Sequence, residues 1–497
     1  MGRFIIEGGR KLGGRLKVQG AKNSALPILA ATVAVGRPCV IHNCPSLTDI
    51  DSTLNILKSL GCEVHRSGNS VSVDSGRMKL NGIPDELMRE MRSSIVFLGA
   101  LITRTGEAHI CAPGGCDIGM RPIDLHLFAM EKLGVSLSEE FGHISCKCQK
   151  VKGAKIALSF PSVGATENIM LASLRCSGTT TIINAAREPE VVDLAMFLNS
   201  CGARISGAGE STVYIEGVER LHGTQFTVMP DRIAACTYMA AAAVTGSDIL
   251  LDDVVPGHIV PIMQCFELSG CKITASQNRL RIISPRRLCA TGTIRTMPYP
   301  GFPTDCQALI MAMAAVADGT TVICENIFEN RFRHAGELNR MGADISVHDK
   351  IAVVNGVGRL QGASVCAHDL RAGAALTVAG MLAPCYVCRD ADGDQMSLAD
   401  LSTKTELENF SVVKCEHGLK ENGGKYICPY CNAELTVSAM QIPGGKPYYY
   451  TDLASALEGS AQLSGQVLLT LLTDTEIAEQ VCVTEGSYAL DLSGRTL

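Results

Sequence analysis

Apolar residues follow the same pattern five times along the chain. A run that is apolar on nearly every helical face ends at a glycine, and a short β-branched run follows, as at Thr180–Ile183. An amphipathic run of helical spacing comes next and ends in a residue–glycine pair such as Leu60-Gly61. Glycine is the usual residue just past a helix end. Each copy therefore predicts a buried helix, a strand, an amphipathic helix and further strands.

The copies recur at a regular interval, which marks them as structural repeats. The glycines that close the apolar runs are about 70 residues apart, as expected of a repeated supersecondary unit; they are Gly36, Gly106, Gly178, Gly246 and Gly319. A helix that is apolar all round is buried on every side. We therefore predict an α/β fold of βαβαββ-type units, each with one helix inside a shell of sheets, the reverse of the usual layering.

A sixth copy starts near Ala363 and stops after its apolar helix, which we expect over Ala372–Ala383. Where the other copies continue with glycine and a strand, this one reads Pro384-Cys385-Tyr386-Val387-Cys388. The pattern does not return in residues 385–497, which are rich in paired cysteines and polar stretches. We therefore predict a truncated sixth unit followed by a small Cys-rich C-terminal region.

Composition narrows the class of protein. A length of 497 residues predicts two or three domains, and 46% hydrophobic residues are enough for sizeable cores. The net charge of −6 gives no reason to expect nucleic acid or an anionic membrane as a partner. No apolar run is long enough for a membrane span, and the N-terminus does not resemble a signal peptide. The 22 cysteines are scattered through apolar segments, which favours a reducing, cytoplasmic location.

Polar or charged residues stand at the start of each predicted buried helix: Lys22-Asn23, Arg92, Ser162, Asp231-Arg232, Asp305, Asp369 and Arg371. Helix N-termini attract anions, and charges beside buried helices are costly unless they pair or face a cleft. The pattern favours a cleft with cations for an anionic ligand and carboxylates for proton transfer. Helix caps and salt bridges between units would produce the same pattern.

One loop, Ala112–Pro122, holds three glycines and two prolines around Cys116 and Arg121. Glycine lets a backbone approach a ligand closely, so the loop could present a thiol and a guanidinium. The alternative is an ordinary loop with a spectator cysteine, because most free cysteines are small buried hydrophobes.

Six motifs together resemble the UDP-N-acetylglucosamine 1-carboxyvinyltransferases, the enolpyruvyl transferases that begin peptidoglycan synthesis. They are Gly20–Pro27, Pro113–Gly119 with Arg121–His126, Ser162–Thr166, Asn184–Glu190, Phe302–Asp305 and Glu325–Arg331. The resemblance covers residues 1 to about 384, and the Pro-Gly-Gly-Cys loop separates the chain from the sister enzyme, EPSP synthase. It implies two inside-out α/β domains of three units each, residues 22–229 and residues 1–21 with 230–384, followed by a tail at 385–497.

The resemblance also implies the reaction. The family transfers the enolpyruvyl group of phosphoenolpyruvate to the 3-hydroxyl of UDP-N-acetylglucosamine, releases phosphate and needs no cofactor. It implies that Asp305 takes the hydroxyl proton and that Cys116 protonates the methylene carbon. A thiol near arginines is expected to have a lowered pKa, and fosfomycin alkylates this cysteine in the family.

The same resemblance implies the residues that bind the substrates. Lys22 and Arg121 would hold phosphoenolpyruvate, and Arg92, Arg331 and Arg371 would line the cleft. The residues expected to contact the nucleotide sugar are Asn23, Arg92, Arg121, Pro122, Ile123, Asp124, Leu125, Asp305 and Ile327, with Ser162 and Val163 at its diphosphate.

The chain departs from the family at its end. The completed sixth unit of the family carries a further arginine for phosphoenolpyruvate, in a segment that reads roughly His-Ile-Asp-Arg-Gly-Tyr. No such segment follows Ala383, and Arg389 does not stand in that motif. This leaves a second hypothesis, a truncated and weakly active or inactive nucleotide-sugar-binding protein fused to a zinc-binding interaction module.

The tail itself predicts a structural zinc site. Cys385-x₂-Cys388 and Cys428-x₂-Cys431 have the paired spacing of a zinc ribbon, although the stretch between the pairs is longer than usual. A redox Cys-x-x-Cys at 428–431 is the alternative, but no βαβ pattern precedes it. No partner for the tail follows from the sequence.

Overall fold

The computed structural model describes Ile6 and residues 8–114 and 122–382 in full, together with the backbone of short strands after residue 385. The chain divides into two compact units, Arg10–Leu382 and a unit made from Met1–Gly9 with Ala383–Leu497. Within Arg10–Leu382 one hydrophobic cluster runs from Ala21 to Val228, and two others take in Val18 and residues from Ile233 to Ala379. We call residues 21–228 the first lobe and residues 10–20 with 229–382 the second lobe.

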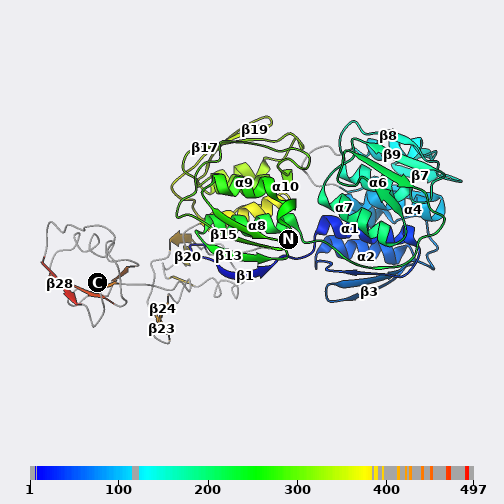
Figure 1. Cartoon of the computed structure of the whole chain (residues 1–497). Coiled ribbons are helices and arrows are strands. Elements are labelled where there is room, and N and C mark those ends of the chain that lie inside the picture. The colour runs from blue at the N-terminus through cyan, green and yellow to red at the C-terminus, as the bar shows by residue number, and fades with distance from the viewer. Residues whose placement is uncertain are drawn as a thin grey trace. The chain divides into compact units, whose positions relative to one another are not determined.

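The first lobe is built around helices that are buried on every face. α1 (Lys22–Val35), α4 (Phe97–Thr105) and α6 (Val163–Ala172) pack on one another inside the strands (Figure 1). Every residue of α1 from Ser24 to Val35 is buried, as its all-apolar sequence predicts. Three helices that are only partly buried pack against this group; they are α2 (Thr48–Ser59), α5 (Asp124–Lys132) and α7 (Pro189–Ser200). The short α3 (Asp85–Glu90) and η1 (Arg92–Val96) precede α4.

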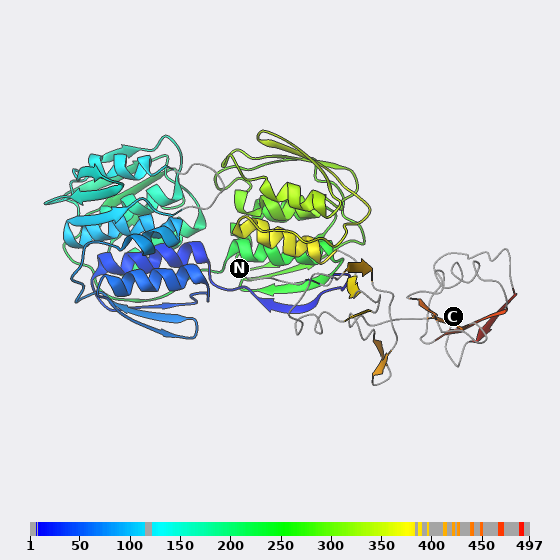
Figure 2. The same cartoon turned by 180° about the vertical axis from the view of Figure 1, so that it is seen from behind.

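The second lobe has the same plan. α8 (Arg232–Val244), α10 (Thr304–Ala314) and α12 (Leu370–Gly380) lie side by side, as Figures 1 and 2 show from opposite directions. The remaining helices are η2 (Pro256–His258), α9 (Val260–Leu268) and α11 (Arg333–Arg340). α12 buries Ala372, Ala375, Leu376, Val378 and Ala379, whereas Leu370 and Thr377 are exposed.

The sheets of the two lobes share one topology. In four of them an outer strand runs parallel to its neighbour, and an antiparallel hairpin completes the sheet, giving the orders β12-β2-β4-β3, β8-β9-β11-β10, β1-β13-β15-β14 and β16-β17-β19-β18. The sheet β5-β7-β6 has three strands, and a parallel bridge from Gly82 to His109 lies at its edge.

The strands of these sheets are short. Their bounds are β1 Gly13–Lys17, β2 Cys39–His42, β3 Glu63–Ser67, β4 Ser70–Asp74, β5 Glu107–Cys111, β6 Ser136–Glu140, β7 His143–Lys147, β8 Lys155–Ala157, β9 Thr179–Ile183, β10 Arg204–Ser206, β11 Thr212–Glu216, β12 Gln225–Thr227, β13 Asp248–Asp252, β14 Lys272–Ser276, β15 Arg279–Ile283, β16 Thr293–Arg295, β17 Thr320–Cys324, β18 Asp344–His348 and β19 Ile351–Asn355.

The chain crosses between the lobes twice, and the two crossing segments pair with each other. β1 belongs to a sheet of the second lobe but leads into α1, and β12 belongs to a sheet of the first lobe but leads into α8. Where they cross, the Ala21 amide donates to the Met229 carbonyl at 2.8 Å, and the Asp231 amide donates to the Gln19 carbonyl at 2.9 Å. Gly20 lies so close to Asn43 that a Cβ would sit 1.7 Å from its carbonyl oxygen. Only glycine fits there.

The mixed α/β fold class is confirmed, whereas the count of six units and the domain boundaries stay predictions. The glycines predicted to close the helices all adopt positive φ, both after the buried helices and in pairs such as Leu60-Gly61. Among the described residues no helix is long and apolar enough to cross a membrane.

After residue 385 the structure describes strand backbone only. The strands are β20 Tyr386–Arg389, β21 Gln395–Met396, β22 Ser411–Lys414, β23 Lys420–Asn422, β24 Lys425–Ile427, β25 Ser438–Gln441, β26 Tyr448–Tyr450, β27 Gln466–Leu471 and β28 Ser487–Asp491. Cys385, Cys428 and Cys431 lie outside the described residues, and so does the side chain of Cys388. The zinc site therefore stays a prediction.

Asp193 gives the crossing region a dependence on pH. This carboxylate on α7 is 6% exposed and accepts hydrogen bonds from the Ser24 hydroxyl of α1 and from the Met229 amide, the latter at 3.2 Å. Burial raises the pKa of Asp193 to about 6, although both hydrogen bonds act in the opposite direction. The folded protein therefore favours the protonated form more than the unfolded chain does, and the stability gained from it is lost as pH rises from about 4 to about 6.

We expect Asp193→Asn to remove this loss. Between about pH 4 and pH 7 the free energy of unfolding of the wild type should fall relative to the variant by on the order of 2 kcal/mol. Urea unfolding of both proteins across that range measures the difference. A difference that stays constant with pH would show that Asp193 titrates normally.

Candidate active site

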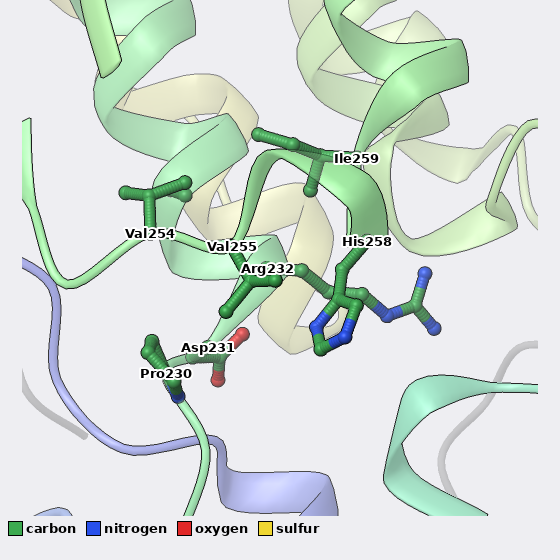
Figure 3. A pocket seen from close by; sticks show the side chains of 8 residues that line it. Pro230, Asp231, Arg232, Val254, Val255, His258 and Ile259 are labelled. Atoms are coloured by element: carbon green, nitrogen blue, oxygen red, sulfur yellow. The ribbon is translucent and has the colours of Figure 1, made fainter. Parts of the chain in front are cut away.

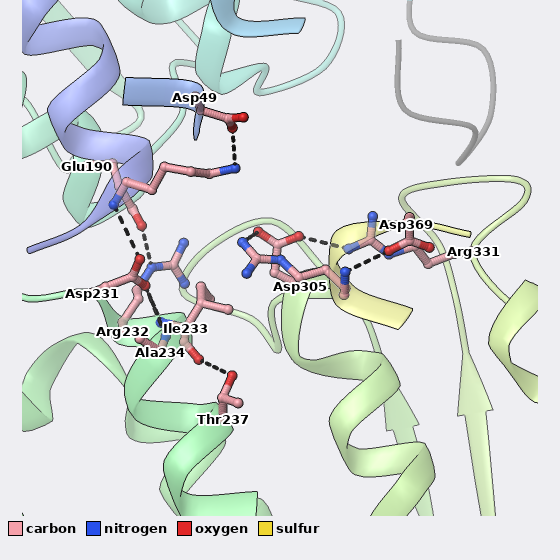
Figure 4. Close-up of polar contacts among 12 residues, drawn as sticks. Asp49, Glu190, Asp231, Arg232, Ile233, Ala234, Thr237, Asp305, Arg331 and Asp369 are labelled. Carbon is pink, nitrogen blue, oxygen red and sulfur yellow. Dashed lines mark hydrogen bonds and ion pairs between the residues drawn. The ribbon is translucent and has the colours of Figure 1, made fainter. Parts of the chain in front are cut away.

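Asp305 lies in the first turn of α10 and is held by two arginines from other parts of the second lobe. Its Oδ1 accepts from Arg331 at 2.8 Å, and its Oδ2 accepts from Arg371 at 3.1 Å (Figure 4). The side chain of Arg331 is 4% exposed, that of Arg371 is 18% exposed, and that of Asp305 is 28% exposed. The structure thus brings together three residues that are far apart in the sequence and were each predicted to belong to the site.

The arrangement decides the charge state of the cluster. Burial alone would raise the pKa of Asp305, but the charges of Arg371 and Arg331 outweigh it and hold that pKa well below its usual range. Asp305 is therefore ionised, as a proton acceptor must be. Its affinity for a proton is nevertheless low while both arginines are bound to it.

A buried carboxylate, Glu325, fixes the loop that carries Arg331; it opens one of the six motifs but was not predicted to belong to the site. Glu325 is 1% exposed and accepts from the Thr296 hydroxyl at 2.8 Å, the Thr304 hydroxyl at 2.9 Å and the Ile327 amide at 2.9 Å. Thr304 begins α10, so one side chain ties the loop after β17 to the helix that carries Asp305. This explains how Ile327 and Arg331 come to lie beside that helix.

Lys22 is the first residue of α1 and is also paired. Its Nζ lies 2.7 Å from Asp49 Oδ2 of α2, and its backbone amide donates to Asp231 Oδ2 at 3.3 Å (Figure 4). Sequence reasoning missed Asp49, which belongs to no motif and looks like an ordinary acidic residue in the first turn of a helix. Lys22 and Asn23 are the first two residues of α1, so they stand at a helix start as predicted, and Asn23 is half-buried.

The other predicted residues lie at helix starts of the first lobe. Arg92 begins η1 and donates to the Pro122 carbonyl at 3.3 Å. Ile123 precedes α5, which begins with Asp124 and Leu125. Ser162 caps α6 by accepting from the Ala165 amide at 3.3 Å, and Val163 is the first residue of that helix. Cys116 and Arg121 lie outside the described residues, so their roles stay predictions.

A second buried ion pair links the lobes. Arg232 Nε of α8 lies 2.9 Å from Glu190 Oε1 of α7, and the two side chains are 9% and 4% exposed. Arg232 also stacks over the Tyr299 ring at 5.7 Å, and the Tyr299 amide donates to Glu188 at 3.3 Å. Burial raises the pKa of the neighbouring Glu167 well above its usual range, and the charges of Glu190 and Glu188 add to this. Glu167 therefore keeps its proton to a higher pH than an ordinary glutamate does.

A small pocket adjoins this pair. It is lined by Pro230, Asp231, Arg232, Ala235, Val254, Val255, His258 and Ile259 (Figure 3). Its empty volume of 180 Å³ includes open solvent. Ligand pockets usually measure about 300–1,000 Å³. The pocket is too small for a nucleotide sugar.

Asp305→Asn should show that the two arginines need an anion. Removing one partner of a buried ion pair costs about 3–5 kcal/mol, and some exposure of Asp305 reduces this to roughly 2–4 kcal/mol. Inorganic phosphate should then raise the melting temperature of the variant more than that of the wild type, because it can take the place of the carboxylate. Asp248→Asn is the matched control, since it breaks an exposed pair with Arg281 in the same lobe. Equal shifts with phosphate in all three proteins would contradict the assignment.

Comparison with known proteins shows which family the chain belongs to. A family model described as EPSP synthase (3-phosphoshikimate 1-carboxyvinyltransferase) matches residues 6–393. UDP-N-acetylglucosamine 1-carboxyvinyltransferase 2 of Caldanaerobacter subterraneus subsp. tengcongensis is 51% identical over 381 residues, which cover 77% of this chain and 91% of the relative. UDP-N-acetylglucosamine 1-carboxyvinyltransferase 1 of Carboxydothermus hydrogenoformans is 48% identical over 383 residues, again 77% and 91% of the two chains.

Solved structures agree. The enolpyruvyl transferase NikO from Streptomyces tendae superposes with a TM-score of 0.67 at 25% identity, over 76% of this chain and 90% of that one. EPSP synthase from Acinetobacter baumannii has the same fold, with a TM-score of 0.60 at 19% identity over 77% and 92% of the two chains. The chain therefore belongs to the EPSP synthase family and, within it, to the UDP-N-acetylglucosamine 1-carboxyvinyltransferases.

Proposed function

We propose that the chain transfers the enolpyruvyl group of phosphoenolpyruvate to the 3-hydroxyl of UDP-N-acetylglucosamine and releases phosphate, the first committed step of peptidoglycan synthesis. Relatives named for this activity are 46–51% identical over 77% of the chain, which supports the proposal. The observation that carries it is the cluster of Asp305, Arg331 and Arg371, because it combines a carboxylate with two cations at the start of a buried helix.

Three cations of the site are already paired with carboxylates of the protein itself. Lys22 is paired with Asp49, and Arg331 and Arg371 share Asp305. Phosphoenolpyruvate brings a phosphate and a carboxylate, which form strong charge-assisted hydrogen bonds with such cations. When the substrate takes over the arginines, Asp305 loses the charges that lower its pKa and becomes a better proton acceptor. Substrate binding would thus activate the base.

The proposed reaction then consists of an addition followed by an elimination. Asp305 takes the proton of the sugar 3-hydroxyl as its oxygen bonds to C2 of phosphoenolpyruvate, and Cys116 gives a proton to the methylene carbon. The new methyl group then returns a proton to the Cys116 thiolate, and phosphate leaves with the proton held by Asp305, which restores the double bond and both side chains. No electron is gained or lost, and in line with the family resemblance the proposal includes no metal or organic cofactor. Positioned acid–base groups of this kind contribute about 10²–10⁴-fold each.

The nucleotide sugar would lie along the helix starts of the first lobe. Ser162 and Val163 stand at the N-terminus of α6, whose backbone dipole favours a diphosphate. We assign the other contacts with the nucleotide sugar to residues that the family resemblance implies; they are Asn23, Arg92, Arg121, Pro122, Ile123, Asp124 and Leu125 of the first lobe, with Asp305 and Ile327 of the second.

We also infer that the chain consists of six βαβαββ units, of which the sixth ends soon after α12. The family's additional arginine for phosphoenolpyruvate is missing from the sequence. A charge-assisted hydrogen bond contributes roughly 1.5–3 kcal/mol, or about ten- to a hundredfold in affinity. The binding of phosphoenolpyruvate would therefore be weaker than in a complete family member.

Phosphate release and calorimetric titration test this directly. We expect phosphate to be released only when both substrates are present, at a low rate. UDP-N-acetylglucosamine should bind with ordinary affinity, and phosphoenolpyruvate at least about tenfold more weakly than to the 51% identical relative measured in parallel. Absence of phosphate release would favour a nucleotide-sugar-binding protein without activity. Ordinary affinity for phosphoenolpyruvate would show that the tail supplies the missing cation, with Arg389 the first residue to replace.

Fosfomycin tests the role of Cys116. The intact protein should gain the mass of one fosfomycin molecule, because a thiolate held near cations is the nucleophile that opens the epoxide. Cys116→Ser should lose this adduct, whereas Cys289→Ser, which removes an exposed cysteine of the second lobe, should keep it. An adduct that persists in Cys116→Ser would overturn the assignment.

A further inference from the structure

The start of α1 depends on a residue from the other lobe. The N-cap position of α1 is Ala21, which makes no side-chain cap, and the first turn holds no acidic residue. The amide of Lys22 donates instead to Asp231 Oδ2 at 3.3 Å. The other oxygen of the same carboxylate, Oδ1, accepts from the Ile233 amide at 2.8 Å and the Ala234 amide at 3.1 Å (Figure 4). One carboxylate therefore serves the N-termini of α1 and α8.

Capping α8 does not by itself require two oxygens. Asp369 caps α12 through Oδ1 alone, which accepts from the Arg371 amide at 2.8 Å and the Ala372 amide at 3.0 Å. Ser162 caps α6 with a single hydroxyl. The second oxygen of Asp231 is thus not needed for the helix cap. It accepts a hydrogen bond from the backbone amide of Lys22 instead.

The hydrogen bond from the Lys22 amide to Asp231 relates two parts of the site, the start of α1 and the cluster around Asp305. The backbone of Asp231 is fixed by its amide, which donates to the Gln19 carbonyl at 2.9 Å. Burial would lower the pKa of Arg371, but the charges of Asp305 and then Asp231 outweigh it, so Asp231 also acts on the arginine that holds Asp305. Asp231 therefore bonds to the Lys22 backbone and also contributes to the electrostatic environment of Arg371.

We propose that Asp231 is a positioning residue for the transfer reaction: its carboxylate caps α8 and holds the first turn of α1, so that Lys22 keeps a fixed place relative to Asp305. The proposal rests on the proposed function, since Lys22 and Asp305 belong to the site only if the chain carries out that transfer. A displacement of about 1 Å in a reacting arrangement can cost about a hundredfold in rate, so a single hydrogen bond to a backbone amide is enough to matter.

Three substitutions separate positioning from helix capping. Asp231→Ser and Asp231→Asn keep an oxygen that caps α8, since both residues are good N-caps, but leave no second oxygen to accept from Lys22. Asp231→Ala removes both contacts. We expect the Ser and Asn variants to melt close to the wild type and above the Ala variant. Their kcat should fall about tenfold or more, while the Kd for UDP-N-acetylglucosamine should change less than about threefold, because positioning acts mainly in the transition state.

Hydrogen exchange gives a readout that does not depend on activity. In the Ser variant the Lys22 amide should exchange faster than in the wild type, whereas the Ile233 and Ala234 amides should not. A Ser variant with wild-type kcat and wild-type exchange at Lys22 would overturn the positioning role and leave the proposed function intact. Failure of the wild type itself to release phosphate from the two substrates would overturn both.

Discussion

The pairing of Asp305 with Arg331 and Arg371 is the constraint on which the rest of the site depends. Charges this deeply placed are stable only when they are compensated, and in the described structure the compensation comes from the protein. Asp49 compensates the charge of Lys22 in the same way, through an ion pair. The site is thus a set of cations that already hold carboxylates of the chain. In the proposed mechanism an anionic substrate exchanges partners with them, and this exchange leaves a carboxylate free to accept a proton.

The inside-out arrangement explains why these groups stand where they do. A helix enclosed by sheets and other helices can meet charged groups only at its ends, and the buried helices of both lobes carry their polar residues at their N-termini. The backbone amides there favour anions, which suits a phosphate and a diphosphate. The two segments that cross between the lobes are also closely packed. Gly20 has no room for a side chain, and Asp193 and Asp231 bind both crossing segments.

Much of the fold could be predicted because local signals agree with tertiary packing. The apolar run after Lys22 could only be a buried helix, and the residue–glycine pairs marked helix ends because those glycines adopt positive φ. Boundaries were less certain: the helix expected over 372–383 runs Leu370–Gly380, because Asp369 caps it earlier than its apolar run suggests. The exchange of β1 and β12 between lobes could not be derived from periodicity, since which sheet a strand joins depends on non-local pairing.

Part of the geometry of the candidate site could also be predicted. Motifs pointed to Lys22, Asp305 and Arg331, and the pattern of charges at helix starts pointed to Arg371; the structure brings the last three together. Asp49, the supporting role of Glu325 and the second contact of Asp231 escaped prediction, because no sequence pattern shows which carboxylate will orient another residue.

The most direct test of this account is the pKa of Asp305, measured by carbon-13 NMR of its carboxyl group with and without substrates. The account predicts a pKa well below the usual range for an aspartate in the free protein. It predicts a higher pKa when phosphoenolpyruvate, bound together with UDP-N-acetylglucosamine in the turnover-impaired Cys116→Ser variant, takes over the two arginines. A pKa that is ordinary in the free protein, or that stays low with both substrates bound, would contradict it.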